Sequence, residues 1–247
     1  ESMGPGVEVS GGSAANTMAG LASMGAKGAF VGKVRNDQLG KVFAHDLKST
    51  GLEFSTPMGE EHSTPTGRCL ILVTPDAERT MNTYLGAATN LGPDDINEDL
   101  IARAQITYME GYLWDRPGAK AAFLKAAQIA HDTNRKVSLT LSDGFCVDRW
   151  RDEFLDLIEN QVDILFANED EIKSLYQVDN FDDAVAHVKS HCQIAALTRA
   201  EKGATIVSGD DVHLVKAEPI SKVIDTTGAG DLFASGFLYG LANDYGL

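Results

Sequence analysis

Apolar residues recur along this chain with two different periods, one typical of helices and the other typical of strands. Leu39, Val42 and Leu47 follow the helical spacing within residues 38–49, and short apolar runs predict strands elsewhere. From Pro93 onward the two patterns alternate. We expect helices at 94–104, 117–132, 149–159, 169–176 and 181–190, and strands at 29–32, 106–109, 137–141, 163–167 and 194–198.

This alternation predicts an α/β fold whose parallel strands are joined by right-handed helical crossovers and bind ligands at their carboxyl ends. Residues 204–208 and 212–217 are expected to form a hairpin. A different pattern occupies residues 54–91, where a polar stretch precedes two strand-like runs. The sequence therefore predicts a single domain over residues 1–247 with a β insertion at approximately 53–91.

Composition narrows the choice of partners. The 247 residues are 43% hydrophobic, which suffices for one large core, and 36 acidic against 21 basic residues leave a net charge of −15. That charge disfavours nucleic acids and anionic membranes as partners. The three cysteines include no Cys-x-x-Cys pair, which argues against a disulfide framework or a structural zinc site. Because no apolar run approaches the ~20 residues of a membrane helix and no signal-peptide pattern is present, we expect a soluble, cytoplasmic protein.

The strongest chemical signal is the segment 225–231, Asp-Thr-Thr-Gly-Ala-Gly-Asp. It precedes apolar residues at helical spacing, so Gly228, Ala229 and Gly230 are expected at a helix N-terminus. Unpaired backbone N–H groups and the positive end of the helix dipole bind an anion at such a position. Asp231 would lie beside that anion, where a carboxylate makes sense as a base that takes the proton from an attacking hydroxyl.

Simpler interpretations of the same segment exist. A short Gly-x-Gly is often only a turn that is followed by an acidic residue in the first helical turn. A Walker A motif is excluded because no Lys-Ser or Lys-Thr pair follows the glycines. A dinucleotide-binding fingerprint is excluded because Phe233 stands where its third glycine would be.

The complete segment resembles the C-terminal signature of the ribokinase-like (PfkB) carbohydrate and nucleoside kinases. Three further motifs occur in that family's order: Gly11-Gly12-Ser13 with Asn16, Asn168 with Glu171, and Thr198 with Gly203. The resemblance covers nearly the whole chain. It implies a ribokinase-like three-layer α/β/α sandwich with a parallel-rich central sheet and a small β lid, and a kinase that uses ATP and Mg²⁺.

By this resemblance, the N-terminal motif binds the substrate. Gly11, Gly12 and Asn16 would contact the hydroxyl groups of a sugar, with Ser13 beside them. Two alternatives remain open, since the glycines could form a plain turn, and Ser13 could cap the helix that follows.

The two central motifs are implied to bind the nucleotide. Asn168 and Glu171 would organise Mg²⁺ and the phosphates, largely through water, and Thr198 and Gly203 would line the nucleotide. The alternatives are a helix capping box for the first pair and the start of a hairpin for the second.

Three more residues receive roles from the resemblance. Asp225 and Thr227 are in register to help bind a monovalent cation such as K⁺. Arg79 resembles an arginine that moves towards the transferring phosphate when the lid closes, although a solvated lid residue is the alternative.

Within the family, several stretches are most similar to adenosine kinases. They are residues 65–69, 139–145 and 162–169. Ser13 occupies a position where ribokinases usually carry lysine. By this resemblance Phe145 would stack on a nucleoside base, an arrangement that the faces of aromatic rings favour, or it is an ordinary core residue.

The sequence thus favours transfer of the γ-phosphate of ATP to a primary alcohol of a ribonucleoside, with the 5′-OH of adenosine preferred. A sugar kinase of the same fold, acting on ribose, fructose or a 2-keto-3-deoxy acid, is the first alternative. A non-catalytic nucleoside- or nucleotide-binding module is the second. The protein is expected to be a monomer or a homodimer, and a fragment, because family members carry segments on both sides of the stretch printed here.

Overall fold

A mixed sheet of six strands forms the centre of the described part of the chain, which comprises residues 6–74, 79–221, 223 and 225–247 of a computed structural model. The first four strands in the order β3-β4-β5-β6-β7-β8 are parallel, and β7 and β8 are antiparallel to their neighbours. The strands are β3 (Ile106–Glu110), β4 (Lys136–Thr140), β5 (Ile164–Asn168), β6 (Ile194–Thr198), β7 (Ala204–Ser208) and β8 (Asp211–Val215).

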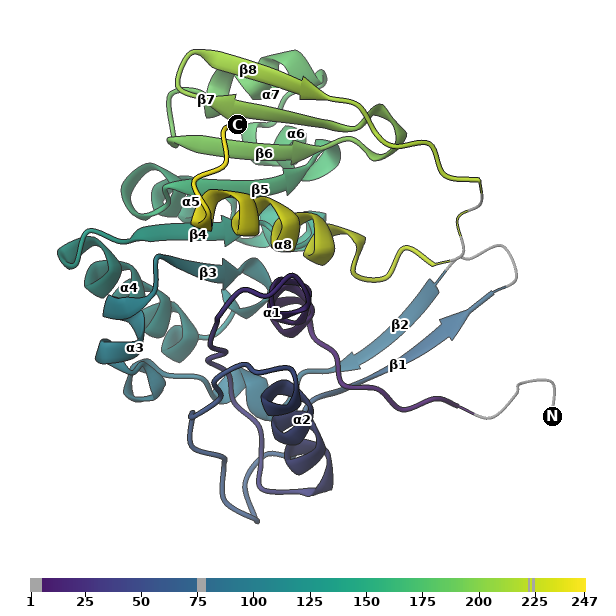
Figure 1. The fold of residues 1–247 in the computed structure, drawn as a ribbon, viewed down its shortest axis with the longest axis vertical. Helices are drawn as coiled ribbons and strands as arrows, with labels where there is room; N and C mark the ends of the chain where they lie inside the picture. The colour runs from purple at the N-terminus through teal and green to yellow at the C-terminus, as the bar shows by residue number, and fades with distance from the viewer. Residues whose placement is uncertain (1–5, 75–78, 222, 224) are drawn as a thin grey trace.

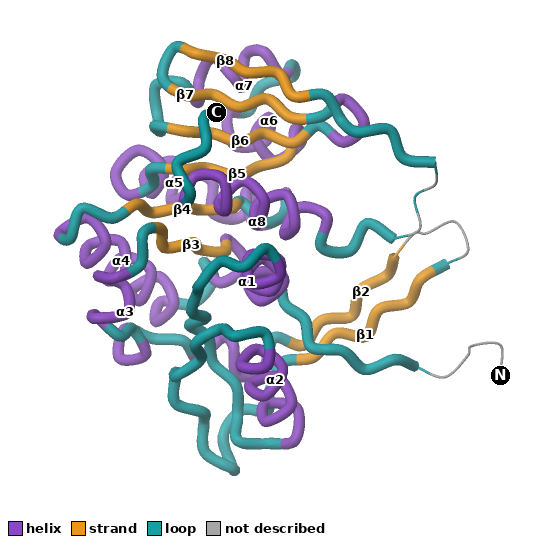
Figure 2. The backbone as a smooth tube through the Cα atoms, viewed as in Figure 1, coloured by secondary structure: helices purple, strands orange, loops and turns teal. Residues whose placement is uncertain are grey.

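Helices cover both faces of this sheet, which gives a three-layer α/β/α arrangement (Figures 1 and 2). One face carries α4 (Pro117–Asp132), α5 (Gly144–Gln161), α6 (Glu169–Tyr176) and α7 (Phe181–Val188). On the other face, α1 (Ser13–Ser23) and α8 (Ala229–Ala242) lie side by side. The remaining helices are α2 (Gln38–Ser49), α3 (Glu98–Arg103) and the short 3₁₀ turns η1 (Gly86–Asn90), η2 (Pro93–Asp95), η3 (Gly111–Leu113) and η4 (Ala200–Lys202).

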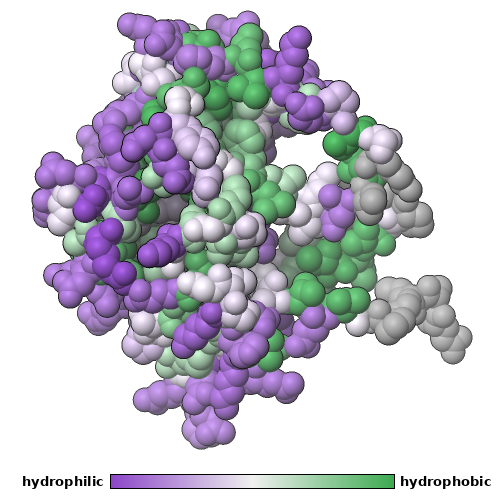
Figure 3. All heavy atoms as spheres, viewed as in Figure 1, coloured by the Kyte–Doolittle hydropathy of each residue, from purple (hydrophilic) through white to green (hydrophobic). Residues whose placement is uncertain are grey.

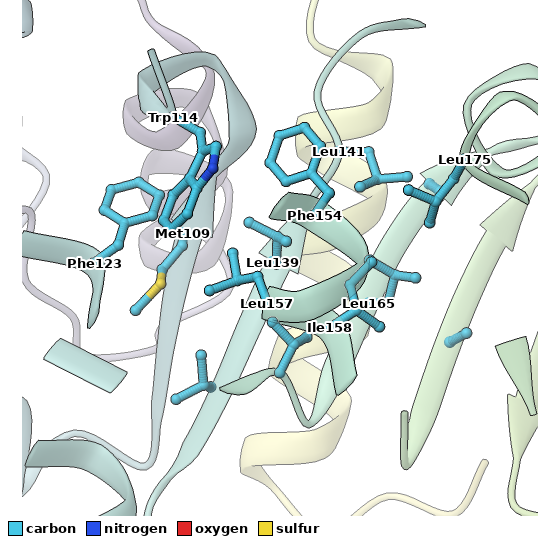
Figure 4. Packing of buried hydrophobic residues seen from close by; sticks show 14 of the residues in the cluster. Met109, Trp114, Phe123, Leu139, Leu141, Phe154, Leu157, Ile158, Leu165 and Leu175 are labelled. Atoms are coloured by element: carbon cyan, nitrogen blue, oxygen red, sulfur yellow. The ribbon is translucent and has the colours of Figure 1, made fainter. Parts of the chain in front are cut away.

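Strand β5 explains why the central strands are continuous apolar runs. Leu165 and Ala167 pack into the core beneath α5 and α6, whereas Ile164 and Phe166 pack beneath α8. Successive side chains of a strand point to opposite faces, and both faces of this sheet are covered, so residues 164–167 are all buried and only Asn168 at the end of the strand is exposed. Figure 4 shows the larger of the two hydrophobic clusters that flank the sheet, in which Leu165 lies among aromatic and aliphatic side chains of the helical layer.

Strands β1 (Arg68–Val73) and β2 (Arg79–Tyr84) form a separate antiparallel pair, here called the β1–β2 ribbon. The ribbon projects from the body of the protein (Figure 1) and exposes apolar side chains, which gather as a green patch in Figure 3. Its base is tied to α2, because Thr66 Oγ donates to Asp37 Oδ1 at 2.6 Å while Asp37 caps that helix. These hydrogen bonds, together with the nearby guanidinium of Arg35, outweigh burial and lower the pKa of Asp37 to about 2.

Most expected elements are confirmed. The helices at 38–49, 117–132 and 169–176 and the strand at 194–198 have the expected bounds. The helix expected at 149–159 begins earlier, since the Asp143 side chain accepts a hydrogen bond from Phe145 N and caps α5.

Two expectations were wrong, and one alternative is excluded. Residues 29–32 form no strand but only an isolated bridge between Ala29 and Glu53. The segment 94–104 is divided, because the Asn97 side chain caps a shorter α3. The excluded alternative is that Ser13 caps α1. Gly12, with φ 106°, is the N-cap, and Ser13 is the first helical residue.

Within the described ranges, none of the helices combines the length and the apolar character that crossing a membrane requires.

Candidate active site

Several residues named from the sequence meet at the carboxyl edge of the sheet. Asn168 and Thr198 are register partners where β5 and β6 end, and Glu110 and Thr140 are partners where β3 and β4 end. The N-terminus of α8 lies at the same edge (Figure 1). Ligand sites of parallel sheets form at this edge, and here it also receives the start of a helix.

Asp231 is held by two residues of α1. Ser13 Oγ lies 2.7 Å from Oδ1 of Asp231, and Asn16 Nδ2 donates to Oδ2 at 2.8 Å. Because both oxygens of the carboxylate are engaged, its plane is fixed in the first turn of α8. The structure thus brings the first and last sequence motifs together.

Small side chains make this meeting possible. A Cβ on Gly20 of α1 would lie 2.4 Å from Ser235 Oγ of α8, so only glycine fits there. Ser235 is 1% exposed, and its hydroxyl donates to the backbone oxygen of Thr17 at 2.7 Å. The close approach of the two helices sets the distance between Asn16 and Asp231.

Glu110 was missed in the sequence, although an acidic residue that ends an apolar strand was a usable signal. It is 5% exposed, its Oε1 lies 2.9 Å from Ser13 Oγ, and its Oε2 accepts from Ser142 Oγ at 3.2 Å. Burial, and then the negative charge of Asp231, raise the pKa of Glu110 to about 7 against the hydrogen bonds that lower it.

The start of α8 has the geometry expected of an anion site. Gly228 is the N-cap in the left-handed region, with φ 73°, and a Cβ on Gly230 would meet nothing within 4 Å. Ala229 N donates to Thr226 O at 3.1 Å, so this N–H already has a partner. The further N–H groups of the first turn point along the helix axis, away from the body of the helix.

Asp225 and Thr227 form a local turn before α8. Oδ1 of Asp225 accepts from Thr227 N at 2.8 Å and from Thr227 Oγ at 2.6 Å. Both side chains are exposed. Their turn shapes the approach to Gly228.

Asn168 and Glu171 form a reciprocal capping box at the start of α6. Asn168 Oδ1 accepts from Glu171 N at 2.8 Å, and Glu171 Oε2 accepts from Asn168 N at 3.0 Å. Glu171 is 6% exposed, and burial raises its pKa to about 7. The capping interpretation is therefore correct for these contacts, and a carboxylate at this edge also suits the oxygen ligands that Mg²⁺ prefers.

No three His, Cys, Asp or Glu side chains in the described part of the chain lie together as a metal-binding group. Mg²⁺ usually binds proteins through one or two carboxylates, several waters and the phosphates of a substrate, and Glu171 is a carboxylate that could serve in this way.

Thr198 and Gly203 lie at the two ends of the loop between β6 and β7. Gly203 has φ 92°, and a Cβ there would lie 2.0 Å from Val215 O of β8. The glycine is therefore required by the packing of the β8 end against this loop.

Phe145 is not a core residue, because 56% of it is exposed. Its ring centroid lies 6.2 Å from that of Tyr112, with the planes tilted by 39°. Tyr112, which the sequence reasoning missed, follows Glu110 by two positions, and burial together with the Asp143 carboxylate raises its pKa. The two rings form an aromatic pair beside the Glu110 carboxyl.

The remaining residues that were expected at the site are two glycines before α1 and an arginine of the β1–β2 ribbon. Gly11 and Gly12 are exposed, and Gly12 O accepts from Asn16 N at 2.8 Å in the first turn of α1. Arg79 begins β2, and its side chain lies outside the described residues.

Comparison with known proteins identifies a family, two solved structures and a relative to which this chain is similar. Residues 5–247 match the family described as pfkB family carbohydrate kinase. An adenosine kinase structure from Sinorhizobium meliloti is 50% identical, with a TM-score of 0.96 over 99% of this chain and 75% of that one. A probable sugar kinase from Rhizobium etli is 53% identical, with a TM-score of 0.95 over 99% and 74%. The 5-dehydro-2-deoxygluconokinase of Bacillus licheniformis is 28% identical over 94% of this chain and 74% of its own length.

Proposed function

The chain belongs to the pfkB family of carbohydrate kinases, and we propose that it transfers the γ-phosphoryl group of ATP to a primary alcohol of a ribonucleoside, with the 5′-OH of adenosine preferred. The observation that carries this proposal is the Asp231 carboxylate, which Ser13 and Asn16 hold at the N-terminus of α8. A base and an anion site are thereby adjacent, as phosphoryl transfer to an alcohol requires.

The acceptor alcohol lies against α1 in this proposal. Gly12 and Asn16 hold the substrate so that its hydroxyl faces Asp231. Each carboxylate oxygen has two lone pairs, so Asp231 can accept the substrate proton while Ser13 and Asn16 keep it in place. Asp231 then acts as the general base, which typically contributes ~10²–10⁴-fold in rate.

The negative charge that develops on the phosphoryl group is stabilised at the start of α8. Backbone N–H groups at the start of α8, those of Gly230 and Asp231 among them, point towards it, together with the positive end of the helix dipole; the Ala229 N–H is instead engaged with Thr226 O. One preorganised donor of this kind is typically worth about 2.7–4 kcal/mol. Mg²⁺, when bound, neutralises phosphate charge, and Glu171 with Asn168 would hold its water ligands. A monovalent cation would bind near Asp225 and Thr227.

The aromatic pair of Phe145 and Tyr112 supports a nucleoside as acceptor. An exposed phenylalanine ring beside the site offers a face on which a base can stack, and such stacking is typically worth ~1–3 kcal/mol. A free sugar offers no aromatic face. The 50% identity to the S. meliloti adenosine kinase also supports this acceptor class.

A sugar or sugar acid is the second candidate acceptor. The R. etli structure is called a probable sugar kinase, and the B. licheniformis relative is named for a keto-deoxy sugar acid. The same base and anion site would serve either acceptor, so the alcohol is chosen by the residues around Phe145. A binding module without activity is the third candidate, which the hydrogen-bonded Asp231 disfavours.

An ADP-release assay tests the proposal. The purified protein is given ATP and Mg²⁺, with and without K⁺, and adenosine, other nucleosides, ribose, fructose or a keto-deoxy sugar acid. We expect the highest kcat/KM with adenosine. Phe145→Ala should lower it by about 5- to 160-fold, the loss that corresponds to ~1–3 kcal/mol for one stacked base. Leu124→Ala, which removes an exposed apolar side chain from α4, is the matched control.

Two results contradict the proposal. If ribose, fructose or the sugar acid is preferred and Phe145→Ala leaves its turnover unchanged, the protein is a sugar kinase. If adenosine raises the melting temperature while no acceptor releases ADP, it is a binding module.

A further inference from the structure

The hydroxyl of Ser13 lies between two carboxyl groups. Its oxygen is 2.7 Å from Asp231 Oδ1 and 2.9 Å from Glu110 Oε1. A serine hydroxyl carries one proton, and an ionised carboxylate can only accept hydrogen bonds. If both carboxyls were ionised, Ser13 would donate to one, and the other contact would join two oxygens with no hydrogen between them. Both contacts can be hydrogen bonds only if one carboxyl is protonated.

The surroundings decide which carboxyl keeps the proton. Asp231 is partly exposed, lies in the first turn of α8 near the positive end of the helix dipole, and accepts the Asn16 amide. Each of these features stabilises its negative charge. Glu110 is 5% exposed, so ionisation there would place a charge in a poorly hydrated position close to another negative charge.

We infer that Glu110 is a positioning residue that is held as a neutral carboxylic acid. Its O–H donates a hydrogen bond to Ser13 Oγ, and the Ser13 hydroxyl in turn donates its own hydrogen bond to Asp231. The inference rests on the proposed function for its catalytic meaning, because Asp231 is the base of that reaction. Its structural content, a protonated Glu110 in the ligand-free protein, does not depend on which alcohol is phosphorylated.

The groups that face Glu110 act on its pKa in both directions. Burial and the Asp231 carboxylate, which faces it from α8, raise the pKa, whereas hydrogen bonds with Ser13, with Ser142 after β4 and with Tyr108 on its own strand lower it. Burial is the main cause of the raised pKa of Tyr112 in η3. The negative charges of Asp143 at the start of α5, of Glu110 and of Glu171 in α6 raise it further. Of the groups that act on Glu110, burial and the neighbouring carboxylate thus disfavour a further negative charge, and they outweigh the hydrogen bonds. The raised pKa of Glu110, about 7, has the same direction.

The consequence is a pH-dependent orientation of the base. While Glu110 is neutral, Asp231 receives hydrogen bonds from both Ser13 and Asn16. When Glu110 ionises, it competes with Asp231 for the single Ser13 proton. Asp231 then loses one of the two hydrogen bonds that orient it. Activity should therefore fall as pH rises through the pKa of Glu110.

Two substitutions separate this role from simple packing. In Glu110→Gln the side-chain amide can still donate to Ser13 at every pH, whereas in Glu110→Ala no donor remains. We expect Glu110→Gln to keep kcat within ~3-fold of the wild type and to lose the decline of kcat above pH ~7. Glu110→Ala should lower kcat by about 10- to 100-fold, the range of a hydrogen bond to a charged group, with a smaller change in KM.

Carboxyl ¹³C NMR of the ligand-free protein gives a readout that needs no activity. With selectively labelled glutamate, the Glu110 signal should titrate near neutral pH and should move to lower pH in Asp231→Asn, which removes the neighbouring charge. A Glu110 signal that titrates as in an unstructured peptide would overturn the inference, as would equal kcat values for the Gln and Ala variants. A wild-type protein that phosphorylates no acceptor contradicts the proposed function instead, and the NMR titration still decides the state of Glu110.

Discussion

The amide nitrogen of Asn16 lies 2.8 Å from Oδ2 of Asp231, although the two residues are 215 positions apart in the chain. This hydrogen bond joins the first helix of the described chain to the last one and places a side chain of the proposed substrate motif on the proposed base. The two motifs therefore form one site. Each prediction below concerns a residue that maintains this arrangement.

The base itself is tested with Asp231→Asn. The amide keeps the shape of the side chain but cannot accept the acceptor's proton, so we expect turnover to fall ~10²–10⁴-fold, the usual contribution of general-base catalysis. The melting temperature should change little. Asp244→Asn, in an exposed position just after α8, is the control and should retain activity. Turnover close to that of the wild type in a folded Asp231→Asn protein would remove Asp231 from the mechanism.

The turn before α8 is tested with Gly228→Ala. Gly228 has φ 73°, where a side chain costs about 1–2 kcal/mol, and its Cβ would lie 3.5 Å from Asp231 Oδ2. We expect this stability loss in denaturant unfolding together with at least ~10-fold lower turnover, since a 1 Å misplacement can cost ~10²-fold. Gly209→Ala introduces the same backbone strain, φ 57°, in the β7–β8 turn. It should lower stability alone. Equal losses of turnover in both variants would argue that stability, not placement of the base, is responsible.

The contact between α1 and α8 is tested with Gly20→Ala. The added methyl group would lie 2.4 Å from Ser235 Oγ, so the helices must separate, at a typical cost of ~1–3 kcal/mol for overpacking. Separation also moves Asn16 away from Asp231, and we expect kcat to fall with stability. Gly236→Ala, on the exposed side of α8 with nothing within 4 Å, should instead raise stability by ~1 kcal/mol through helix propensity. A fully active, stable Gly20→Ala protein would contradict the role of this packing.

The pH dependence of stability follows from Glu110. Its pKa is about 7 in the folded protein and 4.5 in the absence of structure, so between these values the folded state binds more protons than the unfolded state. The stabilisation is complete below pH ~4.5 and is lost as pH rises through ~7, by at most about 3 kcal/mol for a shift of this size. Denaturant unfolding at pH 5 and pH 8 should show this loss.

Glu110→Gln should reduce the difference between the two pH values without abolishing it. Glu171, whose pKa is also raised to about 7 by burial, acts in the same direction. Glu201→Gln, an exposed position in η4, serves as the control and should leave the difference unchanged. If Glu110→Gln retains the full pH dependence, Glu110 is ionised over this range.

Local rules account for the parts of the fold that the sequence predicted. Apolar periodicity located α2, α4 and the central strands, because it reflects which side of each element is covered. The same rules failed at residues 29–32, where apolar residues occur without a strand partner beyond one bridge. They also left open whether Ser13 caps α1, whereas in the structure its hydroxyl contacts Asp231 across the helix interface.

The sequence by itself determined the family resemblance, the helix start at Gly228 and the candidate base Asp231, because glycine turns, helix starts and motif order are properties of short segments. Only the tertiary structure placed Asn16 on Asp231, brought Glu110 to Ser13 from 97 positions away, and exposed the ring of Phe145 beside Tyr112. The physical reason is that a hydrogen bond between distant segments, and the burial that raises the pKa of Glu110, depend on how whole helices and strands pack together.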